Sequence, residues 1–499
     1  MDLPDDNKRT RRGWILAALM LTEMLAAMDT TIVSTAVPQI VGDLGGFALF
    51  SWLFSIYLLA QTVTIPVYGK LADLFGRKPV LIAGTLIFLV GSAACAGAWS
   101  MESLIGFRAL QGLGAGSIMA TVNTLAGDLF SVRERARVQG WLSSVWGMAA
   151  IIGPTLGGAF AEYASWRWIF LINLPVGFAA IVLIVRFLHE RAPHERHRID
   201  FAGAALMLLA GSAVILGLLQ GGHDWPWVSA PSLGVFAVAG LLVATTIWRE
   251  RRAAEPIMPG WVWRHRALVG SNLAAVGMGL VMMGPNTYLP TFAQAVLHLG
   301  AIAAGLVLAS MSIGWPIASS YSGRLYLRIG FRDAGSLGAV LMFAAAIGFV
   351  LLPYPGPLWA IIADQVMLGA GFGLLSTPLL VGIQSAVHWG ERGVVTSANM
   401  WSRYVGQSLG AAVVGAIFNG TMRHQLQHAP ASLSGRLPSV NGVIGALQSG
   451  RLGADAQRYL RDAFYIATHH VYAGIAVAAL LTIVAVLVAP RRFPTAEER

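Results

Sequence analysis

Two carboxylates lie inside an apolar stretch near the start of the chain. Residues 17–40 form a run long enough to cross a bilayer, and it contains Glu23 and Asp29. Because a bare charge inside a membrane costs at least a few kcal/mol, such acids face the protein interior, pair with a cation or hold a proton. Desolvation favours the neutral form of a carboxyl and a nearby cation favours the ionised form. We therefore predict proton exchange at one or both acids; a purely structural polar role is the alternative.

The depth and direction of the two acids differ. Counted from Trp14 at about 1.5 Å per residue, Glu23 lies about 14 Å and Asp29 about 22 Å into a core about 30 Å thick. Glu23 shares a helix face with Thr30 and Ser34, which is typical of a water-filled cavity wall. Asp29 lies on another face, which is better suited to packing against a helix that carries a cation.

Arg108 is the predicted partner of Asp29. It lies in another apolar segment, about 8 Å below the outer surface when counted from Glu102. This depth matches that of Asp29, so we expect the two side chains to meet. A static ion pair is the alternative to a pair that opens during function.

The elements that must hold these residues are membrane helices. The chain has 499 residues, 56% of them hydrophobic and 12% charged, against about 25% charged residues in soluble domains. Apolar segments recur along the whole sequence, and we count about fourteen candidate spans. Most Lys and Arg residues fall on alternate loops if both termini are cytoplasmic. The net charge of +10 then serves insertion beside anionic lipid, and nucleic-acid binding is not expected.

An internal repeat divides the chain into two halves. The segment GKLADLFGRKP at 69–79 returns as GRLYLRIGFRD at 323–333, with Leu327 at the place of Asp73. We expect a six-helix bundle at 1–190, two inserted helices with cytoplasmic linkers at 191–266, and a second six-helix bundle at 267–499. This second bundle includes a long external loop at 421–470. Many transporters place their binding site between two such repeats.

The first copy of this repeat has the composition of a gate. Its glycines, Gly69 and Gly76, allow tight turning. Asp73 can accept hydrogen bonds from a helix N-terminus, and Arg77 can bind carboxylates or carbonyls of the facing half. Asp128 is expected at the same surface. Such contacts form only when the inner side is closed; a pure topology signal is the alternative.

Further side chains are candidates for a seal and a cavity. In GMAAIIGPTLGG, glycines including Gly153 leave a bare helix face, and Pro154 removes a backbone hydrogen bond and can bend the helix. Aromatic and amide side chains could bind flat cations and apolar bodies, although packing is the alternative for each. These cavity candidates are Trp52, Tyr57, Gln61, Asn286, Tyr288, Trp315 and Trp401.

Five motifs together resemble a known family. They are MDTTIVSTAVP, GKLADLFGRKP, RALQGLGAG, GMAAIIGPTLGG and WRWIFLINLPVG, in this order. The chain resembles the major facilitator superfamily, specifically the fourteen-span drug:proton antiporters of the EmrB/QacA type. The resemblance implies an all-α membrane protein of two six-helix bundles plus two inserted helices, working by alternating access. It also implies a role for Arg108 in proton coupling, a seal at Gly153 and Pro154, and export of amphiphilic or cationic compounds.

The sequence favours drug export over several other transport functions. A metabolite importer coupled to protons is disfavoured by the Gly153-Pro154 motif and the span count, whereas a lipid exporter stays open. A primary pump is disfavoured because the phosphate-binding G-x-x-x-x-G-K-[ST] pattern does not occur. We predict no enzymatic activity, no cofactor and no bound metal. We expect a monomer in the cell inner membrane that binds small molecules, protons and lipid; a periplasmic adaptor protein is left open.

Overall fold

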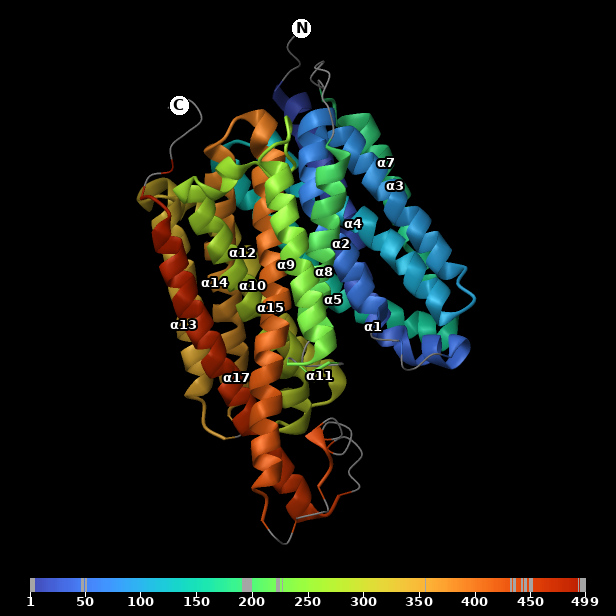
Figure 1. Cartoon of the computed structure of the whole chain (residues 1–499), viewed down its shortest axis with the longest axis vertical. Helices are drawn as coiled ribbons and strands as arrows, with labels where there is room; N and C mark the ends of the chain where they lie inside the picture. Colours follow the sequence, from blue (N-terminus) through green and yellow to red (C-terminus); the bar gives the residue numbers. More distant parts are fainter. Residues whose placement is uncertain are drawn as a thin grey trace.

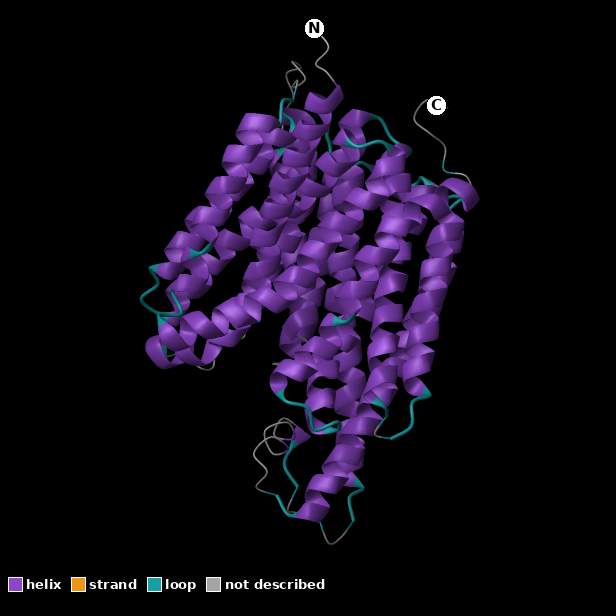
Figure 2. Ribbon diagram, turned by 180° about the vertical axis from the view of Figure 1, so that it is seen from behind, coloured by secondary structure: helices purple, strands orange, loops and turns teal. Residues whose placement is uncertain are grey.

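The computed structural model describes residues 5–45, 49, 52–190, 200–220, 225–226, 228–354, 356–430, 433, 437–440, 443, 447, 452–491 and 493. The regular elements of this part of the chain are helices (Figure 2). Those of the first half are α1 (Asp5–Leu44), α2 (Trp52–Phe75), α3 (Arg77–Ala96), α4 (Met101–Leu129), α5 (Val132–Tyr163), α6 (Trp168–Leu171) and α7 (Asn173–Phe187). Two more follow, α8 (Phe201–Gln220) and α9 (Ala230–Glu250). The remaining elements are η2 (Gly260–Trp263), α10 (Arg266–Ala295), α11 (Ala301–Ala309), α12 (Met311–Ile329), α13 (Phe331–Val350), α14 (Leu358–Ser385), η3 (Trp389–Glu391), α15 (Arg392–Gln427) and α17 (Ala454–Val488).

The helices form two bundles that meet along their length. Helices α1–α7 pack on one another around three apolar clusters, and α10–α17 pack around a fourth. The halves touch mainly where α5 lies against α12 and α2 lies against α15. Both described chain ends lie at the same end of the molecule (Figure 1). We refer to it below as the terminal end.

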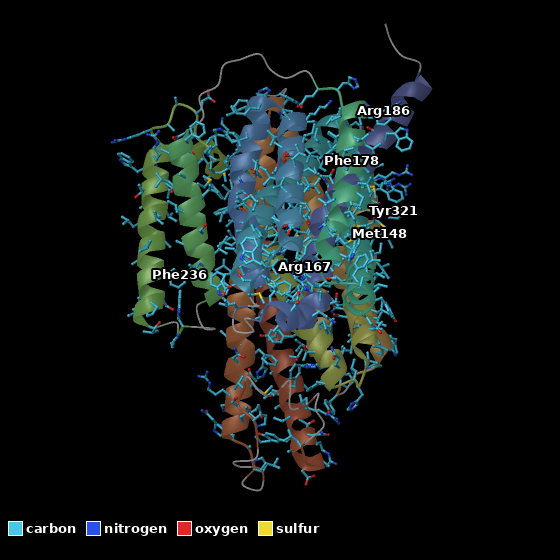
Figure 3. All side chains as sticks on the ribbon, turned by 90° about the vertical axis from the view of Figure 1, so that its right-hand side faces the viewer. Met148, Arg167, Phe178, Arg186, Phe236 and Tyr321 are labelled. Atoms are coloured by element: carbon cyan, nitrogen blue, oxygen red, sulfur yellow. The ribbon has the colours of Figure 1, made fainter. Side chains whose placement is uncertain are left out.

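Helices α8 and α9 lie outside the two bundles. They pack on each other, and α8 contacts α2 and α15 (Figures 1 and 3). An ion pair of 2.8 Å between Asp200 and Arg249 joins the start of α8 to the end of α9. The linker residues 191–199 of the predicted insertion lie outside the described residues. The predicted external loop 421–470 is helical at both ends, because α15 continues to Gln427 and α17 begins at Ala454.

Twelve helical spans in the described part of the chain are long and apolar enough to cross a membrane. Apolar side chains such as Phe178 and Tyr321 point outward from the bundles, as lipid-facing residues do (Figure 3). Helices α4 and α15 are equally long but more polar, and they are the difference between these twelve and the predicted fourteen. The molecule is a multi-pass membrane protein.

Glycines bring α4 close to its neighbours and so place Arg108. A side chain at Gly112 would meet the carbonyl oxygen of Tyr57 in α2 at 2.5 Å, and one at Gly114 would meet the backbone nitrogen of Phe88 in α3 at 2.3 Å. Only a hydrogen fits at these contacts. The QGLGAG motif therefore inserts α4 between α2 and α3 with backbones nearly touching.

Candidate functional site: a central cavity and a gate

A cavity of about 630 Å³ lies between the two halves. Its volume is within the range of sites that hold drug-sized molecules. Among the predicted residues, it is lined by Glu23, Thr30, Ser34, Gln61, Pro154, Asn286 and Trp315. Polar or aromatic lining residues that the sequence did not single out are Asn123, Gln139, Trp146, Asn399, Arg403, Tyr404 and Gln407.

Four predicted cavity residues lie elsewhere in the structure. Trp52, Tyr57, Tyr288 and Trp401 are not among the described residues that line the cavity. Tyr57 is buried against the Arg108 guanidinium, 4.2 Å from its ring centroid, and Tyr288 stacks on Phe418 at 4.3 Å. Aromatic side chains serve packing as well as binding, and their type alone does not tell the two uses apart.

Glu23 is the carboxyl of the cavity wall. It is 4% exposed, and Oε1 accepts a hydrogen bond of 3.1 Å from the indole Nε1 of Trp146 in α5. Its other oxygen, Oε2, has no hydrogen-bond partner in the described part of the chain. A buried carboxylate oxygen without a donor is costly, so this group is poised to hold a proton or to meet a ligand.

Asp29 and Arg108 form a buried ion pair, as the matching depths predicted. Gln111, one turn further along α4, completes a closed triangle. Its Oε1 accepts from Arg108 Nη1 at 2.8 Å, and its Nε2 donates to Asp29 Oδ1 at 2.8 Å. Arg108 Nε also donates to the carbonyl of Leu53 at 3.1 Å, while its Nη2 has no partner among the described residues. Gln111 belongs to the RALQGLGAG motif, but its role could not be read from spacing.

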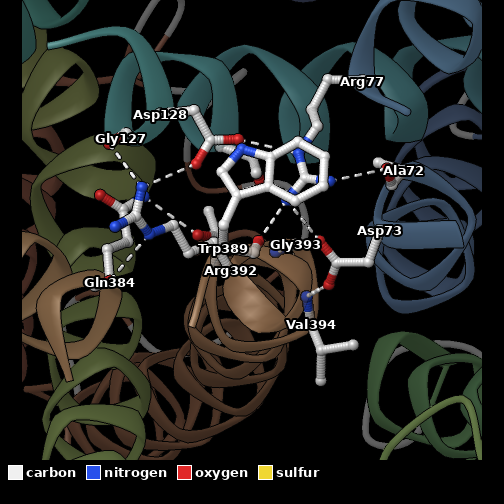
Figure 4. A network of polar contacts seen from close by, with 12 residues as sticks. Ala72, Asp73, Arg77, Gly127, Asp128, Gln384, Trp389, Arg392, Gly393 and Val394 are labelled. Atoms are coloured by element: carbon white, nitrogen blue, oxygen red, sulfur yellow. Dashed lines mark hydrogen bonds and ion pairs between the residues drawn. The ribbon is translucent and has the colours of Figure 1, made fainter. Parts of the chain in front are cut away.

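The motif at 69–79 takes part in a network of polar contacts that joins the two halves (Figure 4). Asp73 accepts hydrogen bonds of 2.9 Å from the backbone N–H groups of Gly393 and Val394, in the first turn of α15. A carboxylate is favoured here because the first helical N–H groups have no partner inside the helix. Asp73 also pairs with Arg77 at 2.8 Å. One acid of the first half thus binds a helix end of the second.

Arg77 extends the network to both halves. It is 0% exposed, pairs with Asp128 at 2.8 Å and donates to the carbonyl of Trp389 at 2.5 Å. Its guanidinium lies 3.6 Å from the centroid of the Trp389 ring. Arg392 of the second half binds the other oxygen of Asp128 at 3.0 Å. Nothing near Arg392 in the sequence indicates a part in this network.

Glycines of the sequence motifs lie where the chain packs too closely, or turns too sharply, for a larger residue. A Cβ at Gly69 would lie 2.1 Å from Ser397 Oγ of α15, so this glycine lets the halves meet. Gly76 has φ of 92°, a conformation that favours glycine. Gly153 lies against α1, where a Cβ would lie 2.1 Å from Thr31 Oγ1. The seal expected at Gly153 and Pro154 stays a prediction.

Asp364 lies away from the cavity lining. Its Oδ2 accepts from Gln365 Nε2 at 3.0 Å, and Gln365 also donates to the hydroxyl of Tyr472 at 3.3 Å. The group is buried between α13, α14 and α17, and the structure assigns it no part in the cavity or the gate. Within the described residues, His, Cys, Asp and Glu side chains form no cluster that could hold a metal ion.

Two packed helical bundles, a cavity between them and a buried ion-pair network at one end are typical of a membrane transporter. The family model of the Major Facilitator Superfamily matches residues 19–411. The chain is 33% identical over 93% of its length to the multidrug transporter protein MdtP of Bacillus subtilis, covering 86% of that protein. It is 31% identical over 86% of its length to multidrug resistance protein 3 of the same organism, covering 84% of it. The chain belongs to the major facilitator superfamily.

Solved structures share the fold at low sequence identity. The human organic anion transporter MFSD10 superposes with a TM-score of 0.63 at 14% identity, covering 95% of this chain and 99% of that one. A bacterial homologue of the iron transporter ferroportin, in an outward-facing state, gives a TM-score of 0.61 at 13% identity, covering 96% and 98%. These likenesses concern the fold alone.

Proposed function

We propose that this transporter is a proton-coupled antiporter that exports amphiphilic or cationic drugs and toxic organic compounds by alternating access. The observation that carries the proposal is the arrangement of one cavity between the halves, a buried carboxyl in its wall and an ion-pair network across one of its ends. The relatives named as a multidrug transporter and a multidrug resistance protein support drugs as the substrate class.

The terminal end is proposed to be cytoplasmic. The helix ends here carry basic residues expected on the inside, including Lys70 of α2 and Arg77 and Lys78 of α3. The network of Asp73, Arg77 and Asp128 then closes the inner side, and the structure corresponds to a state that opens outward. Release of these contacts would open the cavity inward, since a two-state protein needs contacts that exist in only one state.

We further propose fourteen spans, of the EmrB/QacA type, in a monomer of the inner membrane. Helices α4 and α15 have 29 and 36 residues, and each packs along apolar spans of its own half. Their polar residues face α1, the gate and the cavity, which explains their lower hydropathy. Small molecules, protons and the bilayer are the proposed partners.

Proton coupling is proposed to use Glu23 and the Asp29–Arg108 pair. Glu23 faces the cavity, where a proton and a cationic substrate compete for one carboxyl. Asp29 exchanges its proton only when α1 and α4 separate and Arg108 no longer balances its charge. The two acids would thus respond to the substrate and to the conformation respectively.

Transport in liposomes tests this function. Purified protein should accumulate rhodamine 123, a lipophilic cationic dye, only when an imposed pH or voltage difference drives it. ATP should have no effect in a chain without a phosphate-binding loop. Equal accumulation after the gradients are collapsed, sustained by ATP alone, would refute the proposal.

A further inference from the structure

The cavity wall contains a cation, Arg403, in addition to the acid Glu23. Arg403 of α15 lines the cavity, and its Nε has no hydrogen-bond partner in the described part of the chain. Its guanidinium carbon lies 5.5 Å from the ring centroid of Tyr404. Arg403 makes no ion pair within the described residues, unlike Arg77, Arg108 and Arg392.

Glu23 faces Arg403 from the other half. The two residues line the same cavity and form no direct ion pair with each other. Glu23 Oε2 is buried and unpartnered, and Arg403 Nε is in the same condition. One acid of α1 and one base of α15 thus face a cavity of about 630 Å³ with unused hydrogen-bonding atoms on each.

Only a ligand that carries both a positive and a negative group can pair with Glu23 and Arg403 at the same time. A guanidinium presents N–H groups in a planar fork that matches a carboxylate, and a charge-assisted bond of this kind is roughly twice as strong as a neutral one. Arg403 is partly buried and its Nε has no partner among the described residues, so an anionic group that reaches the guanidinium supplies the missing acceptor. A monocation would satisfy Glu23 and leave Arg403 unpaired.

We propose that Arg403 is a specificity-determining residue that binds the acidic group of zwitterionic amphiphiles, with Glu23 receiving their cationic group. The inference rests on the proposed export of amphiphilic drugs and narrows its substrate class. Apolar side chains of the same cavity wall, including Met282 and Trp315, are available to contact the body of the molecule. Zwitterions are selected over cations of the same shape because only they pair both charges.

Two rhodamines test the proposal with one matched pair of ligands. Rhodamine 110 bears a free carboxylate, and rhodamine 123 is its methyl ester with the same fused-ring body. Binding is measured in detergent at pH 7.5 by fluorescence polarisation, without any proton gradient. We expect the parent protein to bind rhodamine 110 about tenfold more tightly than rhodamine 123. Arg403→Gln should abolish this preference by weakening rhodamine 110 only, and Arg403→Lys should restore part of it.

The controls separate specificity from folding. Arg423→Gln makes the same substitution at an exposed position of α15 outside the cavity lining, and it should leave the ratio of the two affinities unchanged. Thermal unfolding of each variant in detergent shows whether it is folded. Equal binding of the two dyes by the parent, or equal weakening of both by Arg403→Gln in a folded protein, overturns the proposal. If the parent binds neither dye, the proposed drug function falls and this inference falls with it.

Discussion

At the scale of single residues, the structure separates two buried acids by their partners. Asp29 is enclosed by Arg108 and Gln111, whereas Glu23 has one donor, Trp146, and one free oxygen. A paired charge and an unpaired one respond differently when the carboxylate is replaced by an amide. Breaking a buried pair leaves an uncompensated charge, but removing an unpaired carboxylate removes a desolvation cost.

Asp29→Asn is expected to destabilise the protein and stop transport. The remaining Arg108 charge is 1% exposed and would lose its counter-charge, at a cost of about 3–5 kcal/mol. The double variant with Arg108→Gln should regain much of this stability and still not transport. Thermal unfolding in detergent and dye uptake into liposomes give the two readouts.

The exposed pair of Asp43 and Arg167 is the control for Asp29. The Arg167 guanidinium lowers the pKa of Asp43, but both side chains reach solvent. Asp43→Asn should therefore change the melting temperature little, because exposed pairs contribute little to stability. Transport by the Asp29–Arg108 double variant would show that the buried pair is only structural.

Glu23→Gln is expected to keep the fold and lose proton exchange. The amide oxygen can still accept from Trp146 Nε1, so stability should be equal to that of the parent or higher. Substrate-induced proton release, measured in weakly buffered detergent solution from pH 6 to 8, should fall by half or more. Undiminished release in the double variant with Asp29→Asn would remove both acids from the proton path.

At the scale of elements, an acid on α2 binds the start of α15. Asp73→Asn should favour the state in which the terminal end is open, because it removes a charge from a buried network shared by both halves. Gln139→Cys, in a Cys95→Ala background, is the reporter: Gln139 lines the cavity behind the gate. Its labelling by a thiol reagent added from the terminal side should increase several-fold, and turnover should slow.

Asp200→Asn is the matched control for this prediction. Asp200 is an acid at the same end of the molecule, paired with Arg249 outside the gate. Its loss should leave labelling at position 139 unchanged. If Asp73→Asn labels and transports like the parent, the network has no part in gating.

The helix pair α1–α5 provides a second prediction at this scale. In Gly153→Ala the new methyl group would lie 2.1 Å from Thr31 Oγ1, so the two helices must separate. Overpacking of this kind costs about 1–3 kcal/mol. Gly158→Ala is the control, since nothing lies within 4 Å of its Cβ position. Equal melting temperatures for the two variants would contradict the contact between α1 and α5.

At the scale of the whole molecule, the number of spans decides where each loop lies. With fourteen spans, the residues between α8 and α9 lie on the side opposite the termini. Ser229→Cys in a Cys95→Ala background should then react with an impermeant maleimide added outside intact cells that express the protein. If α4 did not cross the membrane, Ser229 would lie on the cytoplasmic side and would be labelled only after permeabilisation.

Membership in the superfamily could be predicted from the resemblance of five motifs. The membrane location and the Asp29–Arg108 pair could be predicted because they depend on quantities that a linear chain contains. Hydropathy fixes which segments enter the membrane, and a rise of about 1.5 Å per residue fixes depth. Two groups of opposite charge at the same depth in a low-dielectric medium form an ion pair, because each is costly there without a partner. Asp73 was also predicted as a helix-end acceptor, although its partner helix was not.

Only the tertiary structure decided which side chains face the cavity. Arg403 and Trp401 lie on the same helix two residues apart, yet one lines the cavity and the other does not. Their facing depends on how α15 is rotated and on which helices surround it, and a rotation is set by contacts between segments far apart in the chain. The same holds for Gly153, whose bare surface could have met either half. Sequence determines depth, charge and the capacity for close approach, while the packing of the helices determines which neighbour each residue meets.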